Sequence, residues 1–334
     1  MLRHLSAEAF AAALSCPVIL SCPVAHANDS TATLGLGGLV YTGSSNIRMA
    51  EEDLFLSRDA VTVRYRFENT GDEDVSTLVA FPLPDFVIGD EINYSLPDSA
   101  SGDPVNFIDF SVTVDGQPVP VSVDARATRF GVDVTDILAR HDIPVTLIGG
   151  NALYDRLTDM PEAERRDLVE NGLVDWTTTF GANHKPLANA HWTAHVAFYW
   201  HQTFPAHRPI IVEHRYKPVP GVFFMSEYEL KDADFANKYC IDKSFARAVK
   251  RKLGPDNQTI LHGYDLSYIL TTANNWMGSI GRFSLTIDKG DKNDLVSLCG
   301  EDIEKIGPTT FRLEKTDYAP ANDISVLFVT QPAN

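Results

Sequence analysis

Histidine is the residue type that most strongly suggests chemistry in this 334-residue chain. Six of the ten histidines fall within residues 184–214, namely His184, His191, His195, His201, His207 and His214. On a helix, the four-residue spacing of His191 and His195 would present two imidazoles to one metal ion. In a strand, these two residues share a face but stand about 13 Å apart, too far for one ion.

The surrounding pattern favours the strand. Apolar and polar residues alternate from Trp192 to Trp200, as in a half-buried strand. No HExxH or CxxC motif accompanies the histidines. We therefore predict no metal site and interpret the histidines as surface and packing residues. His214 is in phase with Ile210 and Val212, which predicts a core residue with satisfied ring nitrogens.

Other motifs of catalytic or cofactor sites are incomplete. The Gly35–Gly38 segment resembles part of a dinucleotide loop without its third glycine, and GxSxG and GxxxxGK[ST] do not occur. The acidic runs 72–74 and 288–291 lack EF-hand spacing and are interpreted as exposed turns rather than Ca²⁺ sites. The sequence thus predicts no cofactor and no catalytic residue. A hydrolase or other enzyme with a His, Asp and Arg cluster, with or without a metal, is the alternative.

One loop combines residue types that are enriched at binding surfaces. Tryptophan and arginine are common at binding hot spots, and the nearby Gly278 and Gly281 allow close backbone approach. The predicted binding residues are Asn274, Asn275, Trp276 and Arg282. The alternative is a tight turn on which Trp276 packs.

The first 27 residues have the organisation of a secretory signal peptide. A basic residue, Arg3, precedes an apolar run over residues 10–24, and Ala25-His26-Ala27 supplies small residues at a cleavage site. The run is too short, and too interrupted by proline, for a membrane span. We predict cleavage after Ala27 and a periplasmic or secreted protein.

Cysteine usage agrees with export. Cys16 and Cys22 lie in the leader, which leaves Cys240 and Cys299 in the mature chain. Two cysteines in an oxidising compartment most simply form one disulfide. Lipoprotein processing at Cys22 is an alternative to simple secretion, although Leu20 fits that motif poorly.

Charge narrows the class of partner. With 28 basic and 45 acidic residues, the formal net charge is −17. This balance opposes binding to phosphate backbones, so we expect no nucleic-acid partner. The chain after residue 27 contains no run of eighteen apolar residues, so we predict no transmembrane segment in the mature chain. The expected partner is a protein or a small ligand in the cell envelope.

Alternating patterns predict a mainly β protein with two β-sandwich-like domains. Every odd position from Val61 to Phe67 is apolar, and Asp115-Gly116 between two alternating runs is a hairpin signal. Regular βα alternation does not occur, which argues against a doubly wound sheet.

The predicted first domain covers residues 28–220, with a helical insertion at about 130–185. The second covers 221–334 and carries one helix at about 232–253, which ends at Gly254-Pro255. The disulfide would attach that helix to the second sheet.

A series of short motifs along nearly the whole mature chain resembles a family of secreted bacterial proteins catalogued only as a domain of unknown function. These motifs include Gly37-Gly38-Leu39, Glu52-Asp53-Leu54, Val79 to Asp85, Gln202 to Ala206, Asn275-Trp276, Gly281-Arg282-Phe283 and Asp288-Lys289-Gly290. A fainter similarity of residues 65–69 and 81–84 to the vault and inter-alpha-trypsin type β-sandwich domain implies a fold and no function. We expect a non-catalytic binding or envelope-accessory protein.

Overall fold

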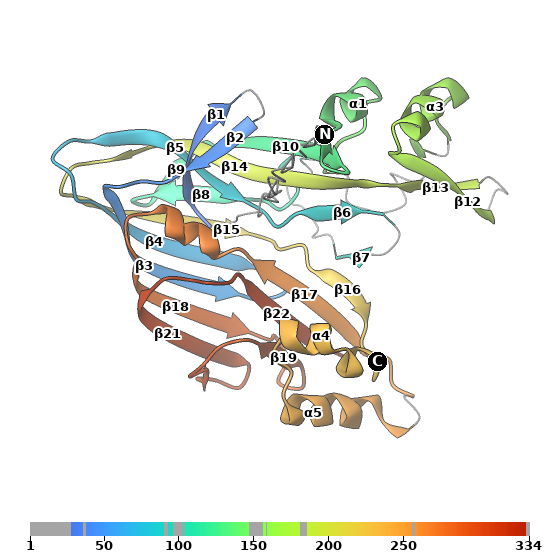
Figure 1. The fold of residues 1–334 in the computed structure, drawn as a ribbon. Coiled ribbons are helices and arrows are strands. Elements are labelled where there is room, and N and C mark those ends of the chain that lie inside the picture. The colour runs from blue at the N-terminus through green and yellow to red at the C-terminus, as the bar shows by residue number, and fades with distance from the viewer. Residues whose placement is uncertain are drawn as a thin grey trace, which may run out of the picture.

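The computed structural model describes residues 28–331 except 36–37, 90–92, 96–102, 104, 147–155, 158, 181–185 and 256–257. Within these residues the chain is mainly β, as predicted, with three large sheets and a short two-stranded one (Figure 1). The predicted leader and His184 lie outside the described residues.

Sheet A collects strands from the first two thirds of the chain, and its long strand β14 borders β10 on one side and β5 on the other. A short strand, β6, pairs with the start of β14. The members in spatial order are β11 (Val132–Asp133), β10 (Ser122–Arg129), β14 (Trp192–Phe204), β5 (Val75–Pro82), β1 (Ser30–Gly35) and β2 (Gly38–Thr42), with β6 (Phe86–Ile88) beside them.

Sheet B joins the two ends of the chain. Its strands β3 and β18 run parallel, while the other described pairs in the sheet are antiparallel. The members in order are β20 (Glu304–Lys305), β21 (Thr310–Tyr318), β18 (Ile280–Asp288), β3 (Ile47–Leu56), β4 (Val61–Asn69), β15 (Pro209–Tyr216), β8 (Ser111–Val114) and β9 (Gln117–Val119).

Sheet C has β22 near one edge and helices against one face. Its members are β19 (Leu295–Leu298), β22 (Ile324–Thr330), β17 (His262–Tyr268), β16 (Gly221–Phe224) and β7 (Asn93–Tyr94). Val326 and Phe328 enter the main core, whereas Leu327 and Val329 pack with the helices. Both faces of this strand are therefore buried, which explains the apolar run from Val326 to Val329.

The predicted strands at residues 61–67 and the hairpin at Asp115-Gly116 are confirmed. Strand β4 alternates between buried and half-buried residues along its whole length, and β8 pairs with β9 across the turn. The two long strands before and after Pro205 lie in different sheets, because β14 belongs to sheet A and β15 to sheet B.

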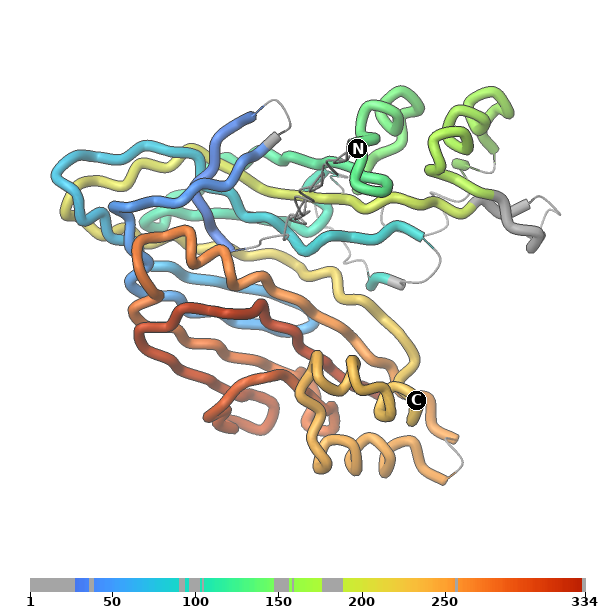
Figure 2. The backbone as a smooth tube through the Cα atoms, in the orientation of Figure 1, coloured from blue at the N-terminus to red at the C-terminus, as the bar shows by residue number. Residues whose placement is uncertain are grey.

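Sheet B contains strands from both sides of the domain boundary predicted at residue 220. Arg282 to Ile287 pair with Glu51 to Leu56, and Figure 2 shows the blue start of the chain beside its orange-red end. One apolar core includes residues from both ranges, such as Val63 and Phe328. The boundary therefore does not separate independent sheets.

The helical segments differ in detail from the prediction. The insertion holds α1 (Thr135–Arg140) and α3 (Glu162–Glu170), followed by the hairpin of β12 (Val174–Phe180) and β13 (Pro186–Ala190). Short 3-10 segments, η1 (Glu229–Lys231) and η3 (Thr271–Asn275), follow later in the chain.

The single helix predicted at about 232–253 is two helices, α4 (Ala233–Lys238) and α5 (Lys243–Leu253). Cys240 has a φ of 49°, which an α-helix cannot accommodate. Asp242 then caps α5 by accepting a hydrogen bond from the Phe245 amide at 2.6 Å.

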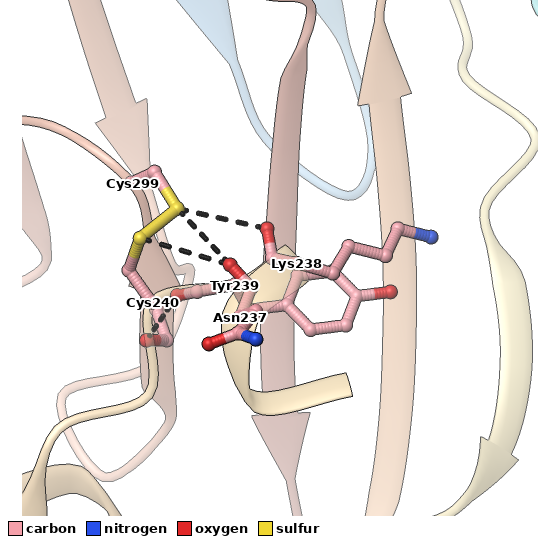
Figure 3. Close-up of a disulfide and its surroundings, with 6 residues drawn as sticks. Asn237, Lys238, Tyr239, Cys240 and Cys299 are labelled. Carbon is pink, nitrogen blue, oxygen red and sulfur yellow. Dashed lines mark hydrogen bonds between the residues drawn. A yellow bond between two sulfur atoms is a disulfide. The ribbon is translucent and has the colours of Figure 1, made fainter. Parts of the chain in front are cut away.

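The predicted disulfide between Cys240 and Cys299 is present, and it closes a separation of 59 residues. It joins the end of α4 to the end of β19, and Cys299 Sγ lies 3.5 Å from the Asn237 carbonyl oxygen (Figure 3). On the chain-entropy account, a loop of this size contributes roughly 4 kcal/mol to the free energy of unfolding.

Replacement of both cysteines by serine should lower the free energy of unfolding by about 2–4 kcal/mol, because the unfolded chain regains the freedom of the open loop. Urea unfolding with and without reductant measures this effect. The reductant should destabilise the wild-type protein and leave the double variant unchanged; equal stability of the two oxidised proteins would contradict the prediction.

Candidate functional site

The predicted binding residues do not form one exposed surface. Trp276 is only 3% exposed, and its Nε1 donates to the Asp29 carbonyl at 2.6 Å. Asn275 Nδ2 donates to Ser30 Oγ at 2.9 Å, and Asn274 Nδ2 donates to the Pro320 carbonyl. Trp276 and Asn275 thus hold the described start of the chain in place, while Asn274 fixes the loop to the segment before β22. The recognition role of the loop stays a prediction.

Arg282 lies elsewhere, on the partly exposed face of sheet B. Its guanidinium donates to Asp53 at 2.8 Å and to Glu51 at 3.3 Å across the parallel pair of strands. Arg64 and Arg66 continue these ion pairs on β4. The arginine thus bridges β18 and β3 rather than joining Trp276.

A fully buried polar cluster lies where the three sheets meet. Asn28 Oδ1 accepts from the Tyr65 hydroxyl, which lies 3.0 Å from the Tyr268 hydroxyl. Tyr268 in turn lies 3.4 Å from Glu52 Oε1, and Glu52 Oε2 accepts from Asn28 Nδ2 at 3.2 Å. These contacts form a closed ring that links the segment before β1 to strands β3, β4 and β17.

Asp29 lies beside this ring and faces His214 on β15. The distance from Asp29 Oδ2 to His214 Nε2 is 3.5 Å. Neither side chain forms a hydrogen bond within the described part of the chain. The prediction that His214 is a core residue is confirmed, since it is 1% exposed. Contrary to the prediction, its two ring nitrogens form no hydrogen bond within the described residues.

Burial dominates the electrostatics of the cluster. It raises the pKa of Glu52 to about 8, because a charged carboxylate loses its hydration there. Burial, with the nearby Glu52, also raises the pKa of Asp29, and burial lowers the pKa of His214 to about 3. These three ionisable groups are out of reach of solvent, with exposures of 0–1%.

Four of the remaining described histidines, His141, His191, His195 and His207, contact acidic residues. No three His, Cys, Asp or Glu side chains in the described residues are placed to hold a metal ion. His195 contacts Asp85 at 2.7 Å and Thr128 at 2.8 Å. His191 lies 2.9 Å from Asp175, and His207 lies 3.0 Å from Asp72. Their partners differ, so the histidines do not converge.

The two acidic runs are occupied by internal contacts. Asp74 accepts from the Ala206 amide, which closes the turn beside β15. In the second run, Lys289 Nζ donates to the carbonyl of Lys292 at 2.8 Å and also to that of Asp294. A lysine ammonium therefore lies where the loop carbonyls converge.

A pocket of about 210 Å³ opens at the junction of the three sheets. Its walls come from the β5–β6 segment, β7, the loop before β8, the chain between β15 and β16, and β17. The lining is mostly apolar and comprises Leu83, Pro84, Asp85, Phe86, Val87, Tyr94, Ile108, Tyr216, Lys217, Pro218, Val219, Gly221, Asp265, Leu266 and Ser267.

The charged groups of this pocket already have partners. Lys217 pairs with Asp109 at 2.9 Å, Asp265 accepts from Lys238 at 2.6 Å, and Asp85 contacts His195. Tyr94 Oη accepts from the Val87 amide at 3.0 Å and fixes β7 over β6. The pocket combines apolar walls with compensated charges, which is an arrangement suited to binding.

Sequence reasoning missed both the pocket and the buried carboxyls. Glu52 offered a signal, since it is in phase with Leu54 and Leu56, which are buried. An irregularity in the pairing between Met49 and Glu51 brings Glu52 onto that inward face. The sequence contained no signal for the pocket, because its wall combines five segments that are separate along the chain.

The sequence matches, over residues 27–327, the family described as "Domain of unknown function (DUF4424)". The chain therefore belongs to this family, as the sequence motifs predicted. Among solved structures it is similar to a Legionella pneumophila protein described as a "putative nutrient binding protein", with 14% identity, a TM-score of 0.42, and coverage of 91% of this chain and 70% of that chain. No curated protein matches.

Among the described residues, no helix combines the length and the apolar character that a bilayer span requires.

Trp276 should matter for stability far more than Arg282. Trp276→Ala should lower the free energy of unfolding by about 3–5 kcal/mol, because it removes a buried ring and the donor to Asp29. Arg282→Ala, a matched control from the same predicted site, should cost no more than about 1 kcal/mol. Urea unfolding measures both, and equally small losses would contradict the structural role of Trp276.

Proposed function

We propose that this chain is an exported, non-catalytic binding protein that holds a small, largely apolar molecule in the pocket at the three-sheet junction. The observation that carries the proposal is the pocket itself, a concave and mostly apolar site of about 210 Å³. Ligand sites usually have apolar walls with a few polar groups, and volumes of roughly 300–1,000 Å³. The smaller volume favours a small molecule over a peptide.

The polar groups at the pocket define the other end of the ligand. Lys217 and Asp265 lie among the lining residues, and each keeps a partner of opposite charge. A polar ligand group can therefore exchange hydrogen bonds with them without leaving an isolated buried charge. We infer a ligand with an apolar body and one polar end.

Two observations support binding over catalysis. Ser267 lines the pocket, but the described lining contains no histidine that could activate its hydroxyl. The strongly perturbed carboxyls, Asp29 and Glu52, are 0% exposed. The chemically unusual groups and the accessible cavity are thus separate, whereas an active site would bring them together.

The proposed location is the periplasm or the exterior of the cell. The leader pattern supports it, and so does the disulfide, because such bonds persist in oxidising compartments. The binding partner is then a small molecule of the cell envelope or the medium, and no nucleic acid is expected at a net charge of −17.

Filling the pocket should abolish ligand binding without unfolding the protein. Val87 lines the pocket and is 47% exposed, so Val87→Trp can place an indole in the cavity from its edge. We expect at least a tenfold weaker affinity for the fluorescent probe 1-anilinonaphthalene-8-sulfonate, since the indole occupies the space of the apolar rings.

The matched control is Val132→Trp on β11, where the residue is 64% exposed and outside the pocket lining. It should bind the probe as the wild type does. Equal probe binding by all three proteins would refute the proposed pocket.

The mature protein should begin at Asn28. The small residues at positions 25 and 27 fit the specificity of signal peptidase, and an intact mass spectrum of the exported protein measures the cleavage site. Replacement of Ala27 by a bulky residue should block processing, whereas Asp29→Asn should not. An exported protein with a different first residue would contradict this site.

A further inference from the structure

The segment that follows the predicted cleavage site is buried. Asn28, Asp29 and Ser30 are each 0% exposed, although the ends of protein chains usually lie at the surface and fray. Contacts from several elements fix them in place: Tyr65 and Glu52 hold the Asn28 side chain, and Trp276 and Asn275 hold the next two residues. The backbone nitrogen of Asn28 is therefore held inside the core.

Two carboxyl groups lie at this position without a permanent cation. Within the described residues, Asp29 has His214 as its ion-pair partner, and Glu52 contacts only Asn28 and Tyr268 through its side chain. Burial keeps His214 neutral near pH 7, because it lowers the pKa of the imidazole. Buried carboxyls of this kind must either hold a proton or find a positive partner.

The unpaired oxygens of Asp29 are a second, independent sign of a missing partner. Both are buried and accept no hydrogen bond within the described residues, whereas buried polar atoms in folded proteins are rarely left without one. A hydrogen-bond donor added to this cluster would therefore remove the free-energy cost of leaving the Asp29 oxygens without a partner.

We propose that the missing cation is the α-ammonium group of Asn28, that the cluster is its binding site, and that Glu52 is its main partner. The proposal rests on the cleavage proposed above. Hydrolysis of the Ala27–Asn28 peptide bond consumes one water and leaves a carboxylate on Ala27 and an ammonium on Asn28. Four covalent bonds separate the α-nitrogen of asparagine from Nδ2, so the two lie at most about 5 Å apart. Since Nδ2 lies 3.2 Å from Glu52 Oε2, the ammonium lies within about 8 Å of the carboxyl and can approach it by rotation about the Asn28 side-chain and backbone bonds.

Processing then completes the core. Before cleavage, the Asn28 nitrogen is a neutral amide, and Glu52 must keep a proton to remain buried. After cleavage, an ammonium and a carboxylate neutralise each other in a region of low dielectric, where such a pair is strong. The mature chain is therefore more stable than the same chain with even one residue added before Asn28.

Two chains with defined first residues test this site. One starts at Asn28 and the other at Ala27, each released from a cleavable tag, so that the second carries its ammonium one residue away, at about 3.8 Å per residue. In urea unfolding at pH 7, the Asn28 chain should have at least a tenfold larger folding equilibrium constant. Equal constants would overturn the proposal.

A matched pair of variants separates charge from steric effects. When both chains carry Glu52→Gln, the folding equilibrium constants of the Asn28 chain and the Ala27 chain should agree within about threefold, because the partner of the ammonium is gone. In Glu314→Gln chains, which change an exposed position on β21, the difference should persist. A difference that survives Glu52→Gln would be steric and would refute the ion pair.

The pH dependence gives a readout without any substitution. In the Ala27 chain, Glu52 keeps its proton up to a pKa of about 8, against 4.5 for the ordinary side chain. The unfolded chain has lost that proton above pH 4.5, so the titration of Glu52 lowers the folding constant tenfold for each pH unit, in addition to the fall that Asp29 causes in both chains. In the Asn28 chain the paired Glu52 is ionised, and this tenfold fall between pH 6.5 and 7.5 should be absent.

Two other groups titrate near this pH window. The unfolded His214 is half-protonated at about pH 6.5 and the α-amino group of an unfolded chain at about pH 7.7, so each changes the folding constant by less than about twofold between pH 6.5 and 7.5. The cluster also contains or faces the ionisable groups Asp29, Asp53, Tyr65, His214, Tyr216, Tyr268 and Tyr318, which are common to both chains. Identical pH profiles of the two chains would contradict the proposal.

These outcomes are independent of the export experiment. Because both chains have engineered first residues, a different natural cleavage site would refute the proposed processing while leaving the chemistry of the site measurable. Equal stabilities would refute the ammonium site even if the exported protein begins at Asn28.

Discussion

The burial of residues 28–31 between three sheets is the constraint on which the rest of the structure depends. Strand β1 adds to sheet A beside β5. Asn28, two residues before it, is bonded to Tyr65 and Glu52 of sheet B, and both of these contact Tyr268 of sheet C. Each such hydrogen bond contributes only about 1 kcal/mol net, but a buried donor or acceptor that loses its partner costs about 1–3 kcal/mol. The cluster therefore adds little to the free energy of unfolding, but it disfavours any other arrangement of the three sheets.

The aromatic residues around His214 further restrict how sheets A and B can be arranged. His214 lies at ring-centroid distances of 5.1–5.4 Å from Tyr65, Phe81, Phe110 and Trp200. These rings come from β4, β5, the residue before β8, and β14, so sheets A and B meet at one imidazole. A shift of either sheet would open space between large side chains, and close-packed interiors tolerate little of it.

Local patterns predicted what depends on local physics. The alternation in Val61 to Phe67 predicted β4, since one face of the strand contacts the core and the other is half-buried. The disulfide between Cys240 and Cys299 was predicted because these are the two cysteines that follow the predicted leader. The short motifs likewise predicted a family known only as a domain of unknown function, and the chain belongs to such a family.

Long-range arrangements could not be predicted in this way. The parallel pairing of β3 with β18 joins residues more than two hundred positions apart, and no periodicity records such a partner. Trp276 has the residue type of a binding hot spot, yet the same large ring also suits a buried position, and only the tertiary contact with Asp29 distinguishes the two. The division at residue 220 failed to follow the sheets for the same reason.

The pocket and the buried cluster share their supports, and this relation favours a rigid binding site. Tyr216 lines the pocket, and its ring also packs 5.6 Å from Phe81 in the core. On β17, Leu266 lines the pocket while Tyr268, two residues later, belongs to the hydrogen-bonded ring. Because residues two apart in a strand face the same side, any change that loosens the cluster also displaces the pocket wall. The polar core thus has a use apart from catalysis, since it fixes the strands that shape an accessible apolar cavity.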